Sequence, residues 1–124
     1  MTPALINRLR DVQAACREIE SFTTGRTLDE LFNDRGFQLI IHKLLEIVGE
    51  ALNQARKIDP SIVDALPDAH RYIAVRHQIT HGYDSIDYKI LWTIATERIP
   101  ELSSSLYQTL TEFEPIETSV DEAQ

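Results

Sequence analysis

The 124-residue sequence has little of several features that define large classes of proteins. Its single cysteine, Cys16, cannot form an internal disulfide, which agrees with a reducing compartment. The longest uninterrupted apolar run covers only residues 72–75, far short of the roughly 20 residues that a membrane-spanning helix needs. The first residues, MTPALINRLRD, carry charge where a secretory signal needs an apolar stretch. We therefore expect a cytoplasmic protein with no membrane segment.

The sequence also lacks internal repeats, a glycine-rich phosphate loop and the alternating pattern of β-strands. Apolar residues recur instead at intervals of three, four and seven, which predicts amphipathic helices. The prediction is all-α: one domain over residues 1–113, an antiparallel up-and-down four-helix bundle with short extra helical segments, and a flexible acidic tail at 114–124. The expected helices cover residues 3–25, a short turn after Thr27, 37–57, 68–81 and 85–113, with a loop at 61–67 and a break or kink at Pro100.

The apolar stripes of these segments predict the core. The first stripe includes Phe22 and the last one ends at Phe113. The remaining expected core positions are Leu5, Leu9, Val12, Ile19, Phe37, Ile40, Ile41, Leu44, Ile47, Val48, Ala51, Leu52, Ala55, Leu102, Leu106 and Leu110.

The charge is unevenly distributed along the chain. The formal net charge is -8. Residues 97–124 hold seven acids and one base, a net of -6, which leaves -2 for residues 1–96. Because the acidity is concentrated in the last helix and tail, the sequence allows a local cationic site for a polyanion elsewhere.

Residues 76–83, RHQITHGY, bring together an arginine, two histidines and a tyrosine. Arginine offers a rigid fork of donors that fits phosphate, and histidine exchanges a proton near neutral pH. These groups are sufficient for RNA cleavage without a metal: a base takes the 2′-hydroxyl proton, the oxygen attacks the neighbouring phosphorus, and the arginine stabilises the developing charge. The candidate site residues are therefore Arg76, His77, His81 and Tyr83.

The spacing of Arg76 and His81 leaves the geometry of this site open. Five positions correspond to about 140° around a regular helix, so the two side chains do not share one face. A helix that ends at Gly82 could let His81 and Tyr83 turn toward a surface that Arg76 also reaches. Alternatively, Arg76 could complete the site from a second copy of the chain.

Each of these residues also has an ordinary structural explanation, as a solvated charge, a helix cap or an amphipathic residue at the core edge. His77 and His81 share a helix face and could hold a metal. No Glu follows the first histidine, however, and no Cys or carboxylate clearly completes a ligand set. The sequence thus favours neither a metal nor a cofactor. His42 and His70 are isolated and are predicted to be structural or surface residues.

The run Arg76-x4-His81-x-Tyr83 resembles the Arg-x4-His-x-Tyr signature of HEPN-domain proteins, in particular the HepT-like toxins. Two flanking stretches are also similar to that family: LLEIVGEALNQ in the second long helix, and DYKILWTIATERIPEL after the signature. The resemblance covers residues 37–110. It implies a helical bundle that forms a homodimer, with the two signatures facing each other in a composite active site.

The resemblance also implies an activity. The chain would be the toxin of a type II-like toxin–antitoxin pair, a metal-independent endoribonuclease that cleaves single-stranded mRNA or tRNA. Arg76 and His81 would be catalytic, and His77 and Tyr83 would line the site. The antitoxin would be a minimal nucleotidyltransferase that transfers AMP to Tyr83, placing negative charge beside Arg76.

Two other functions remain compatible with the same residues. One is a non-catalytic HEPN partner of a nucleotidyltransferase that binds nucleotide or RNA without cutting it. The other is a purely structural helical dimer, which explains the bundle but not the cluster at 76–83. The acidic tail suggests a contact with the antitoxin, which unchanged antitoxin affinity after deletion of residues 112–124 would contradict.

Overall fold

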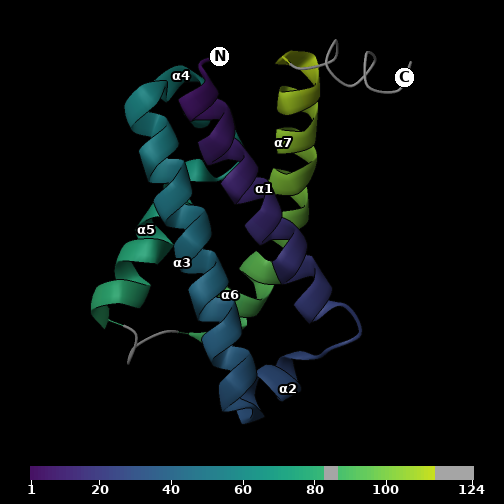
Figure 1. Ribbon diagram of the computed structural model, residues 1–124. Coiled ribbons are helices and arrows are strands. Elements are labelled where there is room, and N and C mark those ends of the chain that lie inside the picture. The colour runs from purple at the N-terminus through teal and green to yellow at the C-terminus, as the bar shows by residue number, and fades with distance from the viewer. Residues whose placement is uncertain (83–86, 114–124) are drawn as a thin grey trace.

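The computed structural model describes residues 1–82 and 87–113, with side chains placed for residues 1–77 and 87–113. These ranges contain helices and no strand, so the predicted all-α class is confirmed. The elements are α1 (Pro3–Thr23), α2 (Leu28–Asn33), α3 (Arg35–Ile58), α4 (Pro60–Asp64), α5 (Ala69–Gly82), α6 (Tyr88–Thr93), the π-helix η2 (Ile94–Arg98) and α7 (Ile99–Phe113) (Figure 1).

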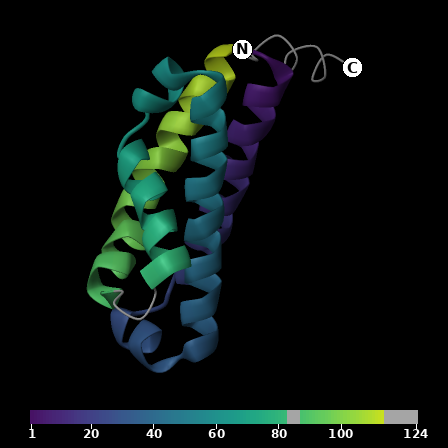
Figure 2. The same cartoon turned by 90° about the vertical axis from the view of Figure 1, so that its left-hand side faces the viewer.

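The long helices form an antiparallel bundle. Helix α1 packs against α3 and α7, and α5 packs against the other side of α3. Consecutive long helices run in opposite directions, and α6, η2 and α7 together form the fourth rod (Figures 1 and 2). The up-and-down bundle predicted from the sequence is therefore present. Dimerisation, the domain limit at residue 113 and the character of residues 114–124, which lie outside the described ranges, stay predictions.

Local capping signals explain where the first helices begin. The Thr2 hydroxyl accepts a hydrogen bond from the Leu5 N–H at 3.2 Å, and Thr27 does the same for Glu30. Helix α1 ends before Gly25, whose φ of 76° suits a residue without a Cβ. These starting points agree with the sequence prediction.

Helix α3 starts earlier than predicted. The Asp34 carboxylate accepts a hydrogen bond from the Phe37 N–H at 3.0 Å, and this hydrogen bond lowers the pKa of Asp34 below its ordinary value. Gly36, expected before the helix, consequently lies in its first turn. A side-chain cap at the residue before Arg35 is worth more to the helix than one glycine at its start costs.

The loop predicted at residues 61–67 was wrong in part, because it contains α4. Asp59 ends α3 and caps α4 by accepting from the Ser61 and Ile62 N–H groups. Pro60 occupies the first helical position, where its missing N–H costs nothing, and Val63 is buried. A single turn of helix is too short to show a period in the sequence.

The fourth rod begins at Tyr88, with Asp87 as its cap, where the sequence suggested a start near Ser85. Pro100 does not break it. Proline has no N–H and its ring crowds the carbonyl of the fourth residue before it. The wider turn of η2 relieves this crowding, and the Ile99 N–H bonds to the Ile94 carbonyl.

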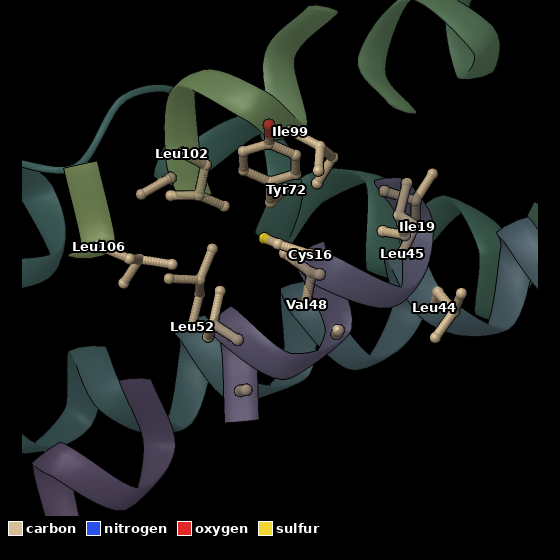
Figure 3. Packing of buried hydrophobic residues seen from close by; sticks show 14 of the residues in the cluster. Cys16, Ile19, Leu44, Leu45, Val48, Leu52, Tyr72, Ile99, Leu102 and Leu106 are labelled. Carbon is tan, nitrogen blue, oxygen red and sulfur yellow. The ribbon is translucent and has the colours of Figure 1, made fainter. Parts of the chain in front are cut away.

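The core is a continuous cluster of aliphatic side chains from α1, α3, α5 and the fourth rod. Figure 3 shows Tyr72 and Cys16 among Leu52, Ile99 and Leu102. Burial raises the pKa of the Cys16 thiol to about 12, so this thiol stays protonated and unreactive near neutral pH.

Several predicted core positions are exposed instead. Phe22 and Phe113 lie at the ends of α1 and α7, and both side chains are exposed within the described part of the chain. Ile47 is also exposed, although it belongs to the apolar stripe of α3. No helix in the described ranges is long and apolar enough to cross a membrane.

Candidate functional site

Arg76 lies on α5 at the contact between α5 and α3. Its guanidinium Nη1 is 3.2 Å from the Oε2 of Glu50, and the side chain is 26% exposed. The pair is therefore partly desolvated, although Glu50 remains accessible to solvent. An arginine held in this way has its guanidinium plane in a fixed orientation, and the guanidinium fork matches the geometry of a phosphate.

Gly49 allows α5 to approach α3 at this point. A Cβ on Gly49 would lie 2.5 Å from the Arg76 Cβ and 2.5 Å from the Tyr72 carbonyl oxygen. Atoms do not pack at such distances, so no other residue fits here without moving a helix. Gly49 thus sets the distance between the backbones, and Glu50, its neighbour, reaches the arginine.

Arg76 also lines a groove between α1 and α3, which we call the Arg76 groove. Its volume is about 570 Å³. Each of its three cations lies close to a carboxylate: Arg76 by Glu50, Lys43 by Glu46 at 3.0 Å, and Arg8 by Asp11 at 3.5 Å. A fourth carboxylate, Glu18, also lines the groove. The groove is therefore polar, with its positive charges already balanced.

The other predicted site residues are only partly within the described structure. His77 is exposed on α5. His81 belongs to α5 by its backbone, but its side chain and all of Tyr83 lie outside the described residues. The roles predicted for these four residues therefore stay predictions.

Helix α5 ends at Gly82, the residue at which the sequence suggested its end. The helix is continuous through Gly82. Because it does not end before His81, Arg76 and His81 remain about 140° apart around the same helix axis. The backbone therefore places the Cα atoms of these two residues on different sides of α5.

Sequence reasoning missed Glu50 and Gly49 as site residues. Both stand in the LLEIVGEALNQ stretch, which was noticed only as a resemblance. A glycine in the middle of a long helix costs about 1 kcal/mol relative to alanine, which is a signal of close helix packing. The sequence contains no signal that its partner helix is the one that carries Arg76.

A second group of side chains anchors the segment that follows the signature. The ring of Tyr88 stacks on His42, with ring centres 5.7 Å apart, and meets the edge of Phe32. The Tyr88 hydroxyl donates to Gln38 Oε1 at 3.1 Å, and Gln38 Nε2 donates to the carbonyls of Leu31 and Phe32. These contacts fix the start of α6 against α2 and α3.

The two isolated histidines have the structural and surface positions that the sequence suggested. His42 is buried, and burial, together with the charge of Arg35, lowers its pKa below the ordinary value. His70 is exposed, with Nε2 at 3.2 Å from Asp64 Oδ1. Among the residues with described side chains, no group of three or more His, Cys, Asp or Glu residues is arranged to hold a metal ion.

Comparisons with known proteins identify a family for this chain. The family described as Ribonuclease HepT-like matches residues 12–108. A protein of Thermococcus cleftensis named "Probable ribonuclease HepT" is 29% identical over 98 residues, which cover 76% of this chain and 84% of the relative.

Two proteins of Methanocaldococcus jannaschii whose names mark them as candidate RNases are also similar. One is 27% identical over 94 residues, covering 74% of this chain and 75% of the relative. The other is 26% identical over 100 residues, covering 79% and 89%. No solved structure gives a significant match.

Proposed function

The chain belongs to the HepT-like ribonuclease family of HEPN proteins, and we propose that it is the toxin of a type II-like toxin–antitoxin pair, an endoribonuclease that cuts single-stranded mRNA or tRNA. The observation that carries this proposal is the contact between two segments that resemble HEPN proteins. Glu50 of LLEIVGEALNQ pairs with Arg76 of the Arg-x4-His-x-Tyr signature, and Gly49 allows the approach. The fold thus joins the two motifs at the residue that would bind the scissile phosphate.

In the proposed reaction, Arg76 and His81 act on one phosphodiester. A histidine can take the proton from the 2′-hydroxyl or give one to the leaving 5′-oxygen. The 2′-oxygen attacks the adjacent phosphorus, the bond to the 5′-oxygen breaks, and a 2′,3′-cyclic phosphate results. Arg76 stabilises the additional negative charge on the phosphate oxygens. This chemistry requires no metal ion.

A homodimer would resolve the separation of Arg76 and His81. Because α5 is helical through Gly82, the Cα atoms of the two residues lie about 140° apart around the helix axis in one chain. A two-fold axis that sets two α5 helices against each other would place Arg76 of one copy opposite His81 of the other. We therefore propose a composite active site that only the dimer completes, with His77 and Tyr83 lining it.

The proposed antitoxin is a nucleotidyltransferase of the minimal type, which transfers AMP to the hydroxyl of Tyr83. The tyrosine oxygen attacks the α-phosphorus of ATP, and pyrophosphate leaves. The product adds a negative phosphate two residues from His81 and fills space near the cleft. Both changes oppose the binding of RNA.

Cleavage of single-stranded RNA by the purified protein tests the catalytic proposal. We expect His81→Ala to lower the rate by about 10²- to 10⁴-fold, because it removes the general acid or base. His70→Ala, which changes an exposed histidine on the same helix, should leave the rate unchanged. A chelator in the assay tests the proposed independence from metal ions, since the rate should not fall.

The product of the antitoxin is tested by intact mass after co-expression with a nucleotidyltransferase. We expect mass increases of whole AMP units in the wild type and in Tyr107→Phe, which changes an exposed tyrosine of α7. Tyr83→Phe should show none. If the protein binds RNA but cuts none in either state, it is better described as a non-catalytic HEPN partner of the nucleotidyltransferase.

A further inference from the structure

A second groove lies between α5 and the α6–η2 segment, and we call it the Ile90 groove. Its volume is about 420 Å³, within the range of small-ligand sites. Ile90, Val75 and Ile94 contribute apolar surface to it. Ile90 is 60% exposed, an unusual value for an isoleucine in a groove. Exposed apolar surface of this kind often marks a binding site.

Cationic side chains also line the Ile90 groove, beside its apolar residues. Arg71, Lys89 and Arg98 line the groove together with one carboxylate, Asp68. The Arg71 Nε is 3.7 Å from Asp68 Oδ1 and the Arg98 Nη1 is 4.0 Å from Glu101 Oε1, so both pairs are loose. Lys89 has no ion-pair partner among the described residues. The groove therefore carries a positive excess on a chain whose formal net charge is -8.

The groove also leads toward the signature. Ala74 lies on the side of α5 that lines it. Seven positions further along the regular helix, the Cα of His81 is about 20° around the axis from that of Ala74 and about 10 Å along it. A chain seated on the Ile90 groove therefore continues toward the end of α5, where the predicted catalytic histidine stands.

The geometry points to a subsite for one nucleotide of a single-stranded RNA, with its base on Ile90, Val75 and Ile94 and its flanking phosphates beside Arg71, Lys89 and Arg98. Apolar contact with an unstacked base and cations along the backbone are the usual means of binding single-stranded RNA. The subsite rests on the proposed function, because the scissile bond would lie toward His81. Its aliphatic floor offers no hydrogen-bond pattern, so we expect little preference among bases.

The test uses a short single-stranded RNA that carries 2′-O-methyl groups throughout. It cannot be cut, because no 2′-hydroxyl is free, so its binding is measured independently of catalysis. We expect Ile90→Asn to weaken binding of this RNA by about fivefold or more, the effect of removing the apolar surface under one base. Leu39→Asn is the matched control, since Leu39 is 50% exposed, lies on α3 and does not line the groove.

A pair of charge reversals tests the cationic edge. Arg71→Glu should weaken binding and lower the slope of log affinity against log salt by about 0.7 for each phosphate that the protein no longer neutralises. Arg17→Glu makes the same change in net charge at an exposed position of α1 and should keep the wild-type slope.

Three results would overturn the subsite: no binding of the methylated RNA to the wild type, equal losses of affinity in a variant and its control, or a change of molar mass in solution for Ile90→Asn alone. The last result would identify the groove as an interface between copies. Failure of the proposed function looks different, because the wild type would then bind methylated RNA through Ile90 and leave unmodified RNA uncut.

Discussion

The two grooves beside α5 differ in how their charges are arranged. In the Arg76 groove, each cation lies within 3.5 Å of a carboxylate, and the carboxylates outnumber the cations. In the Ile90 groove, three cations and one carboxylate border exposed aliphatic side chains. An acidic protein can therefore present a locally cationic surface, while the arginine of its signature is held by an acid. The net charge of the chain therefore does not identify its binding partner.

Gly49→Ala should have the largest effect of the changes considered, because it disturbs the packing of α5, the helix between the two grooves. The added Cβ would lie 2.5 Å from Arg76 Cβ and from the Tyr72 oxygen, so α5 must move away from α3. We expect the free energy of unfolding to fall by about 1–3 kcal/mol, although alanine favours helix formation. Urea unfolding measures this change.

Gly36→Ala is the matched control on the same helix. Its Cβ would meet only the Asp34 carboxylate, at 3.4 Å, so we expect unchanged or slightly higher stability. A similar loss of stability in both variants would contradict the role of Gly49 as the point of close approach.

Glu50→Gln would make the Arg76 groove less negative and so reduce its difference in charge from the Ile90 groove. We expect binding of methylated RNA to strengthen by about fivefold, because a full charge at about 4 Å from a phosphate-binding group is worth about 1 kcal/mol in water. The effect on folding should be small, since Glu50 is exposed to solvent.

Glu46→Gln is the control for this effect, because Glu46 lines the same groove but pairs with Lys43 instead of Arg76. Equal strengthening of RNA binding in both variants would mean that the effect comes from the net charge of the groove. It would contradict the expectation that Glu50 competes with the RNA phosphate for Arg76.

The pH dependence of stability tests the anchor that holds α6, one wall of the Ile90 groove. The pKa of buried His42 is lower in the folded protein than in the unfolded chain, where it is about 6.5. The unfolded state therefore binds the proton first, and stability should fall as the pH drops below about 6.5. The slope for one proton is at most about 1.4 kcal/mol per pH unit.

Unfolding by urea at a series of pH values measures this slope. His42→Gln should remove this contribution, whereas His70→Gln, on the surface, should retain it. An unchanged slope in His42→Gln would assign the pH dependence to other groups.

Tyr72→Phe should have the smallest effect. The Tyr72 ring borders the Ile90 groove, but its hydroxyl is buried and has no hydrogen-bond partner among the described residues. Burial raises the pKa of this hydroxyl well above its ordinary value, so it stays neutral. Removing it should leave stability unchanged or raise it by about 1 kcal/mol. A clear loss of stability or of RNA binding would show that the hydroxyl has a partner.

The sequence predicted a helix correctly where its apolar pattern was long enough to show a period. Long periodic stretches predicted the bundle helices, and Thr2 and Thr27 marked their starts. The single turn of α4 carries too few residues to show a period. Periodicity also placed Phe22 and Phe113 in the core, because a stripe gives the direction of a side chain but not the extent of the neighbouring helix.

The candidate site could also be predicted only in part. Its residue types and their spacing could be read directly, including the separation of about 140° between Arg76 and His81. Glu50 could not be assigned, because its partner is on another helix and the register between the two is set by packing. The positive excess of the Ile90 groove was hidden for the same reason, since Arg71, Lys89 and Arg98 come from two rods of the bundle.

The sequence by itself determined the helical class, the capping of the first helices, the candidate residues at 76–83 and the resemblance to HEPN proteins. These features depend on neighbours within one or two helical turns, which the order of residues specifies. Only the tertiary structure decided that Gly49 brings α5 against α3, that Glu50 holds Arg76, and that three cations meet around Ile90. Each of these contacts joins residues from different helices, and their meeting depends on how the faces pack together.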